Sequence, residues 1–101
     1  MTLRFLPAAD KELVEAAQWY EDRCDGMGVR FLSAIIQTCS NVEKHPLRYP
    51  PPPGRTKRDV RRAIVDGFPY LIVYEIRGPD LIVIAVAHAR RRPGYWNRRG
   101  R

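Results

Sequence analysis

The stretch LIVIAVA, residues 81–87, is an almost unbroken apolar run, and it leads directly into HARRRPGYW, residues 88–96. A short continuous apolar run is typical of a strand buried on both faces, and it predicts a strand over residues 81–89. The residues that follow place an imidazole, three guanidinium groups and two aromatic rings at the end of that strand. Arginine binds phosphate through two parallel hydrogen bonds and stays charged at any working pH. The candidate functional site therefore lies where this strand ends.

The first half of the chain predicts a short strand and two helices. Thr2–Leu6 has the pattern of a strand, and Pro7 ends it while also suiting the first turn of a helix. Apolar residues at helical spacing predict a first helix from Ala8 to about Cys24 and a second helix that runs up to His45. The sequence DGMG, residues 25–28, predicts the break between them, because two glycines can take positive φ angles. We expect a helical hairpin.

The second half predicts a sheet. YPPPPG, residues 49–54, predicts a stiff extended connector, because proline fixes φ and lacks an N–H; a proline-rich ligand for a recognition domain is the alternative. Strands are predicted over Val60–Val65 and Phe68–Ile76, with a tight turn at Asp66–Gly67, and RGPD, residues 77–80, turns the chain into the last strand. The result is an α+β fold of order β-α-α-β-β-β: an N-terminal strand, a helical hairpin that covers one sheet face, and a three-stranded antiparallel meander.

Length and composition restrict the class of protein. A chain of 101 residues that is 45% hydrophobic predicts a single domain over residues 1–101 with one core. Cys24 and Cys39 lie within the predicted helices without metal-ligand spacing, so we expect reduced core thiols and no metal or other cofactor. The sequence has no apolar leader and no run long enough to cross a bilayer, which indicates a cytoplasmic protein.

The net charge of +7 is unevenly distributed. Residues 1–50 hold six basic and seven acidic side chains, a balance of −1, whereas residues 51–101 hold twelve basic and four acidic ones, a balance of +8. Such a field attracts polyanions, either nucleic acid or an acidic protein partner, although basic residues can also serve only for solubility. Two dense clusters favour the functional interpretation. They comprise Arg55, Lys57, Arg58, Arg61 and Arg62, and then Arg90, Arg91, Arg92, Arg98, Arg99 and Arg101.

Strand periodicity predicts how these cations are oriented. Alternation places His88 and Arg90 on one side of the last strand and Arg91 on the other. Arg61 and Arg62 alternate in the same way on the strand that begins at residue 60. If the two strands are neighbours, or are one strand apart, the basic clusters merge into a single groove.

Five segments together carry a family resemblance. They are AAQWYE (16–21), GMGVRFL (26–32), HPLRYP (45–50), GFPYLIVY (67–74) and AVAHARRRPGYW (85–96). In order and spacing they resemble the RelE/ParE superfamily of bacterial toxins, often called plasmid-stabilisation proteins, over almost the whole chain, and the helices and hairpin are closer to the ParE-like branch. The resemblance implies a growth-inhibiting toxin held inactive by a cognate antitoxin. An antitoxin with an acidic, apolar-striped C-terminal segment could fold onto this protein and neutralise its charge.

The resemblance leaves the effector step open. RelE-like members cleave messenger RNA in the ribosomal A site, whereas ParE-like members inhibit DNA gyrase and need no catalytic residues. Whether the chain is an enzyme is therefore also open. A third alternative is a non-toxic family member that only binds nucleic acid or an antitoxin.

RNA cleavage would need a base, an acid and cations around the phosphorus. His88 titrates near neutrality and could be either proton-transfer group, Tyr95 could be the second, and arginines could hold the phosphate. The candidate catalytic residues are His88, Arg90, Tyr95 and Arg62. The candidate residues for binding nucleic acid or a partner are Arg55, Lys57, Arg58, Arg61, Arg91, Arg92 and Trp96, where Trp96 could stack on a base.

Three of these candidates have an equally simple structural explanation. His88 could be an ordinary hydrogen-bonded histidine at a strand end. Tyr95 and Trp96 could pack the C-terminal residues against the helices and cover the sheet edge, and for Trp96 we favour packing.

Overall fold

A computed structural model describes residues 2–54 and 57–100. In chain order the elements are β1 (Thr2–Phe5), α1 (Pro7–Arg23), α2 (Met27–Lys44), β2 (Val60–Ile64), β3 (Tyr70–Arg77) and β4 (Asp80–His88). The predicted α+β class and the order β-α-α-β-β-β are confirmed, and the predicted boundaries differ from these by one or two residues.

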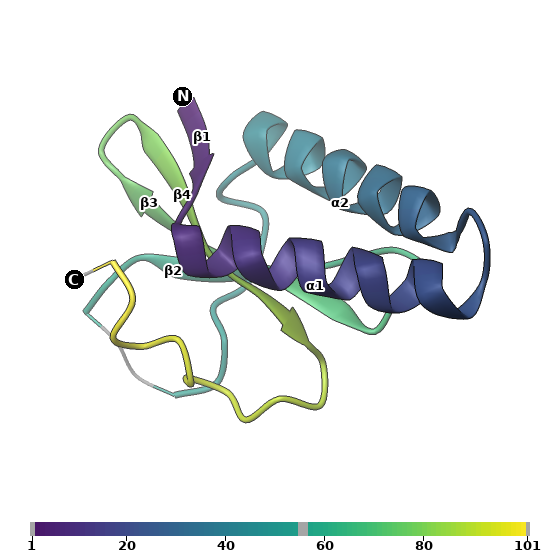
Figure 1. Cartoon of the computed structure of the whole chain (residues 1–101). Helices are drawn as coiled ribbons and strands as arrows, with labels where there is room; N and C mark the ends of the chain where they lie inside the picture. The colour runs from purple at the N-terminus through teal and green to yellow at the C-terminus, as the bar shows by residue number, and fades with distance from the viewer. Residues whose placement is uncertain (1, 55–56, 101) are drawn as a thin grey trace.

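The sheet has the strand order β1-β4-β3-β2, so β4 is an inner strand. β1 runs parallel to β4, while β4 with β3 and β3 with β2 are antiparallel. Helices α1 and α2 lie together on one face of the sheet, and the C-terminal residues pass below it (Figure 1). This central position explains why residues 81–87 are apolar without alternation, because all of them are buried.

A β-bulge in β4 shifts the alternation of its side chains. Val73 pairs with Ala85 and Tyr74 pairs with Val83, so Ile84 is an additional residue on β4. Ile84 and Ala85 both join the cluster on the face away from the helices. That cluster consists of Val60, Val73, Ile84, Ala85, Ala87 and Trp96. The helix-facing core includes Phe31, Ile35, Val42, Ile72, Tyr74, Leu81 and Val83.

The helical hairpin depends on one carboxylate and two glycines. Glu21 near the end of α1 accepts hydrogen bonds from the backbone N–H groups of Gly26 (2.9 Å) and Gly28 (3.0 Å), which caps the start of α2. Gly26 has a φ of +83°, as predicted, but Gly28 has no positive φ. A Cβ at Gly28 would lie 2.8 Å from the carbonyl oxygen of Ala17, so this glycine permits close approach of the two helices.

The proline-rich connector lies along β2. The backbone N–H of Arg62 donates to the carbonyl of Pro50 (3.0 Å), and the Arg61 guanidinium donates to the carbonyls of Leu47 (2.8 Å) and Tyr49 (3.1 Å). These bonds cover the outer edge of the sheet, which would otherwise present unpaired backbone groups to other chains.

The two cysteines occupy different environments. Both are free thiols; Cys39 is buried, as predicted, and burial, with a contribution from the charge of Glu43, raises the pKa of its thiol to about 11. Cys24 is exposed, so its predicted place in the core is wrong. It is the first residue beyond α1 and lies in the loop that connects the two helices.

No helix in the described part of the chain is long and apolar enough to span a bilayer. Within residues 2–54 and 57–100, no three His, Cys, Asp or Glu side chains gather as a metal site would require.

Candidate functional site

The end of β4 is a tight turn. The backbone N–H of Arg91 donates to the carbonyl of His88 (2.9 Å), and that of Arg90 donates to His88 Nδ1 (3.1 Å). Because β4 ends at His88, the predicted alternation of Arg90 and Arg91 is wrong: both belong to the turn. The half-buried imidazole packs edge-on against Tyr70, with ring centroids 5.2 Å apart.

Tyr95 is held by a carboxylate from α1. Its hydroxyl donates to Glu12 Oε2 (2.7 Å), and the Arg99 guanidinium donates to both Glu12 oxygens (2.7 and 3.2 Å). The backbone N–H of Val86 on β4 also donates to Glu12 (3.1 Å). We call Glu12, Tyr95 and Arg99 the Glu12 clip. Burial, followed by the hydrogen bond to Glu12, raises the pKa of Tyr95 well above its ordinary value. A phenol in this state is a weaker acid than free tyrosine.

The raised pKa of Tyr95 predicts a loss of stability in alkali. Unfolded Tyr95 ionises near pH 10.0 but the folded residue ionises only above that value, so its contribution is complete below about pH 10 and falls as the pH rises further. Urea unfolding at several pH values should therefore show a steeper alkaline loss for the wild type than for Tyr95→Phe. Tyr74, whose pKa burial raises to about 12, is present in both proteins and cancels in the comparison. Parallel curves above about pH 10 would contradict this assignment.

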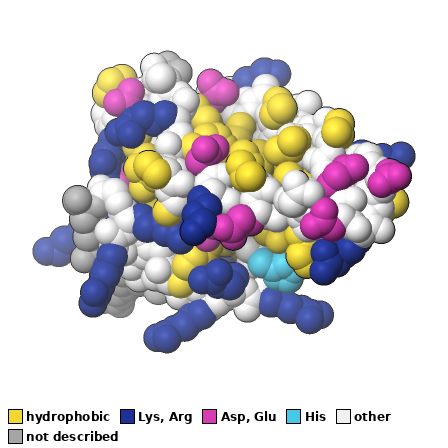
Figure 2. All heavy atoms as spheres, in the orientation of Figure 1, with side chains coloured by type: hydrophobic (Ala, Val, Ile, Leu, Met, Phe, Trp, Pro, Cys, Tyr) yellow, Lys and Arg dark blue, Asp and Glu magenta, His cyan; other side chains and the backbone are white. Residues whose placement is uncertain are grey.

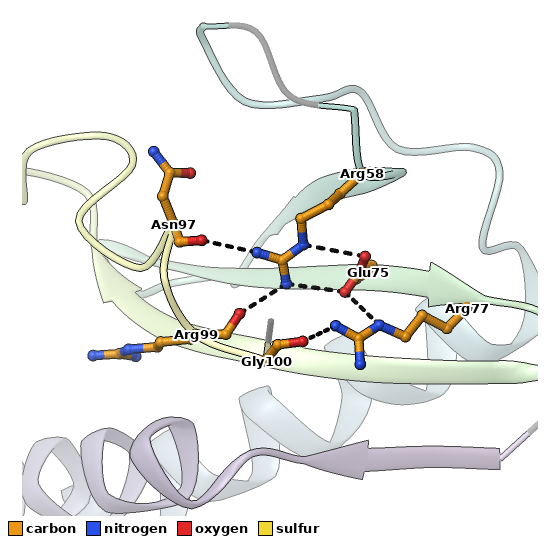
Figure 3. A network of polar contacts seen from close by, with 6 residues as sticks. All are labelled: Arg58, Glu75, Arg77, Asn97, Arg99 and Gly100. Atoms are coloured by element: carbon orange, nitrogen blue, oxygen red, sulfur yellow. Dashed lines mark hydrogen bonds and ion pairs between the residues drawn. The ribbon is translucent and has the colours of Figure 1, made fainter.

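A second polar network joins the sheet to the C-terminal tail, residues 94–100 (Figure 3). Arg58 forms a two-bond contact with Glu75 (3.1 and 2.9 Å), and Arg77 Nε lies 2.9 Å from the same carboxylate. Glu75 is buried on β3, so the cations compensate a charge that would otherwise be costly there. The two guanidiniums also donate to carbonyls of the tail, those of Asn97, Arg99 and Gly100.

Trp96 is buried, with 4% of its surface exposed. It packs in the cluster on the sheet face away from the helices. The preferred packing explanation is therefore confirmed, but the predicted contact with the helices is wrong. The bulge at Ile84 turns two consecutive apolar side chains toward that far face, and the tail covers them.

The remaining basic candidates fall into two groups: cations that are committed to the fold, because they pair with a carboxylate of the protein, and cations that have no such partner. Arg61, like Arg58, is committed to the fold: it pairs with Asp59 (2.9 Å) and binds the connector. Among the basic residues of the two clusters, the exposed ones for which no carboxylate partner occurs in the described part of the chain are Lys57, Arg90, Arg91, Arg92 and Arg98, and half-buried Arg62 joins them. Arg55 and Arg101 lie outside the described residues.

Arginines of the turn after β4 line two recesses. A groove of about 560 Å³ runs between α1 and the strand ends and is lined by both charge signs, including Glu12, Glu15 and Arg91. A small depression of about 40 Å³ on the other side brings Arg62 of β2 together with Arg91 and Arg92. Since β3 separates β2 from β4, the predicted meeting of the two basic clusters across one intervening strand is confirmed for these three residues.

The sequence analysis missed Glu12 and Glu75, which organise both networks. Glu75 carried a usable signal: it is the one carboxylate in a strand that is apolar up to its last residue, Arg77, and a buried charge requires a cationic partner. Glu12 gave no comparable signal, because an acidic residue early in an amphipathic helix normally faces solvent.

Comparison with known proteins identifies the family. The chain matches the family described as "ParE toxin of type II toxin-antitoxin system, parDE" over residues 3–93. No curated protein matches it. A solved structure titled "Chromosomal ParDE TA system from P. aeruginosa" is similar to 87% of this chain and 95% of that chain, with a TM-score of 0.72 and 13% identity, which shows a shared fold. The chain therefore belongs to the ParE toxin family of type II toxin–antitoxin systems, whose toxins are neutralised by a cognate antitoxin.

Proposed function

We propose that this toxin stops growth by binding and inhibiting DNA gyrase, without cleaving RNA itself. The observation that carries the proposal is the Glu12 clip, which occupies the Tyr95 hydroxyl and keeps it protonated. General acid–base cleavage of RNA needs two proton-transfer groups suited to the working pH. Tyr95 in this state is a poor second group beside His88. Gyrase inhibition, which the ParE-like resemblance implies, requires no catalytic group and would take place in the cytoplasm.

Cleavage of messenger RNA is the second candidate because of one observation. His88 is half-buried rather than enclosed, and it lines the larger groove next to Arg91. A histidine beside an arginine could transfer a proton while the guanidinium holds a phosphate. This arrangement would still need an acid or base other than Tyr95.

The variant His88→Asn separates the two mechanisms. Asparagine retains an acceptor for the Arg90 N–H but cannot titrate, so the turn after β4 is preserved. In a supercoiling assay with purified gyrase, we expect the variant to inhibit within about twofold of the wild type, an energy difference below about 0.5 kcal/mol. In a reconstituted translation reaction, primer extension should find the message intact.

The opposite result would replace the proposal. Cleavage at codons in the A site that disappears in His88→Asn would make the protein an endoribonuclease. Inactivity of the folded wild type in both assays would favour the non-toxic alternative, a protein that only binds nucleic acid or an antitoxin.

The cognate antitoxin is proposed to bind with an acidic segment that also carries an apolar stripe. Hydrophobic side chains gather over α1 and α2, while Lys and Arg side chains project from the part of the molecule below α1 (Figure 2). Val14, Val29 and Leu32 are exposed and line a groove of about 320 Å³ between the two helices. An amphipathic segment could cover this apolar surface with one face and reach the cations with acidic residues.

A further inference from the structure

We infer that the depression lined by Arg62, Arg91 and Arg92 binds backbone phosphates of duplex DNA, and that through it the toxin contacts the DNA held by gyrase. This inference rests on the proposed function and assigns duplex DNA to the toxin as a partner besides gyrase and the antitoxin. We call the three arginines and the depression between them the arginine depression.

The protein segregates its cations by role. Arg58 and Arg77 neutralise Glu75, Arg99 neutralises Glu12, and Arg61 pairs with Asp59. None of the described residues that line the arginine depression is acidic. Three guanidiniums placed around one depression repel each other unless an anion lies between them. Glu12, Asp59 and Glu75 therefore pair with other arginines, and the arginine depression remains available to an external anion.

The arginine depression is held in place by the fold. The backbone of Arg62 is paired within the sheet, opposite Val73, and its N–H donates to the connector at Pro50. The Arg91 guanidinium lies 3.9 Å from the centroid of the Tyr95 ring, which the Glu12 clip fixes. Two of the three cations are thus attached to rigid supports, which lowers the entropy lost when a phosphate binds.

The size of the arginine depression favours a phosphate over an antitoxin helix. A volume of about 40 Å³ accommodates one small anionic group but no apolar side-chain stripe. The apolar groove between α1 and α2, which lies on the helical side of the sheet, suits such a stripe better. Arg90 is exposed in the same turn and could reach a neighbouring phosphate along a nucleic-acid backbone.

The aromatic residues favour duplex DNA over single-stranded RNA. Proteins bind single strands by stacking unpaired bases on exposed aromatic rings. None of the three aromatic rings that line the depression is free: Trp96 is buried under the sheet, the Tyr95 ring lies beneath Arg91, and the half-buried His88 imidazole packs edge-on against Tyr70. A surface of guanidiniums without a free aromatic ring offers splayed bases no aromatic platform, and it is suited to gripping the phosphates of a duplex backbone.

The decisive comparison uses two double variants of equal net charge. Arg62→Gln/Arg92→Gln removes two cations of the arginine depression, and Arg30→Gln/Lys44→Gln removes two exposed cations from α2 on the other side of the sheet. With a labelled duplex of about 20 base pairs and fluorescence anisotropy, we expect the first variant to bind about tenfold more weakly, and the control to change less than about threefold. The slope of log affinity against log salt should fall by about 2 for the first variant.

Equal losses for the two variants would overturn the inference, because they would indicate a general effect of net charge. The inference would also be overturned if Arg62→Gln/Arg92→Gln lost more affinity for poly-glutamate or for single-stranded RNA than for the duplex. That result would assign the surface to an acidic protein or to RNA. Circular dichroism and urea unfolding verify that both variants fold.

The gyrase assay distinguishes this inference from the proposed function. If the wild type fails to inhibit gyrase but the arginine variant still loses duplex affinity selectively, the phosphate site stands and the proposed function fails. If wild type and arginine variant inhibit gyrase and bind the duplex equally, the proposed function stands and the phosphate site is wrong.

Discussion

Replacing Glu75 with glutamine should lower the free energy of unfolding by about 3 kcal/mol, because the change removes one partner of a buried ion pair and leaves the other in place. The side chains of Glu75 and Arg58 are only 7% and 15% exposed, so water can solvate the unpaired guanidinium poorly. Glutamine matches the carboxylate in shape but brings two N–H donors toward two guanidiniums that can only donate. Urea unfolding followed by circular dichroism measures the change.

The matched control is Asp59→Asn, another exchange of a carboxylate for an amide next to an arginine. The Asp59 side chain is 47% exposed, and its pair with Arg61 is accessible to water, so we expect a loss below about 1 kcal/mol. Arg77, the second partner of Glu75, is 40% exposed and adds little to the difference. If the two variants were equally stable, the contacts of Glu75 would be as weak as those of a surface pair.

The order of elements was predictable because each segment carried a local signal. Periodic apolar residues defined α1 and α2, the Asp66–Gly67 turn defined the hairpin, and the continuous apolar run defined β4 as a buried strand. These signals lie within a few residues of the structure they specify. The same local reasoning failed just after His88, where a turn closed by the histidine's own ring nitrogen replaced the expected alternation.

The roles of the basic residues were much less predictable. Arg58 and Arg62 stand four positions apart in one cluster, yet Arg58 joins the tail to β3 and Arg62 lines an open depression. What separates them is the position of Glu75 and Glu12, and the bond from Tyr95 to Glu12 spans 83 residues of sequence. A single sequence contains no local sign of such pairings. A basic cluster therefore shows an excess of positive charge but does not show which of its residues form ion pairs within the protein.

The Glu12 clip also explains how the sheet tolerates its short first strand. β1 pairs with β4 only as far as Val83, which leaves the later backbone groups on that edge without a strand partner. The carbonyl of Ile84 accepts from Arg99 (3.2 Å), and the N–H of Val86 donates to Glu12 (3.1 Å). Side chains from α1 and the tail therefore satisfy an edge that could otherwise pair with another chain. The edge, the tail and the position of Arg91 depend on the same few contacts.

Replacing Trp96 with alanine should cost about 3 to 4 kcal/mol of stability, because it empties a large buried site whose rigid strands cannot close the cavity. The other tryptophan supplies the control: Trp19 is 50% exposed on α1, and Trp19→Ala should cost about 1 kcal/mol or less. Urea unfolding followed by circular dichroism compares the two variants without relying on either tryptophan as a probe.

Trp96→Ala should also bind duplex DNA more weakly than the wild type. The comparison is made at salt concentrations at which the variant stays mostly folded. The Tyr95 ring packs against the cluster that contains Trp96, so Trp96→Ala removes one of its two supports and leaves only the Glu12 clip to position the ring and, with it, the Arg91 guanidinium. If a folded Trp96→Ala protein binds duplex DNA as tightly as the wild type, the packing of the tail does not position the arginine depression. Weaker binding without any change in Arg91 itself would show that packing on one face of the sheet positions a cation at its end.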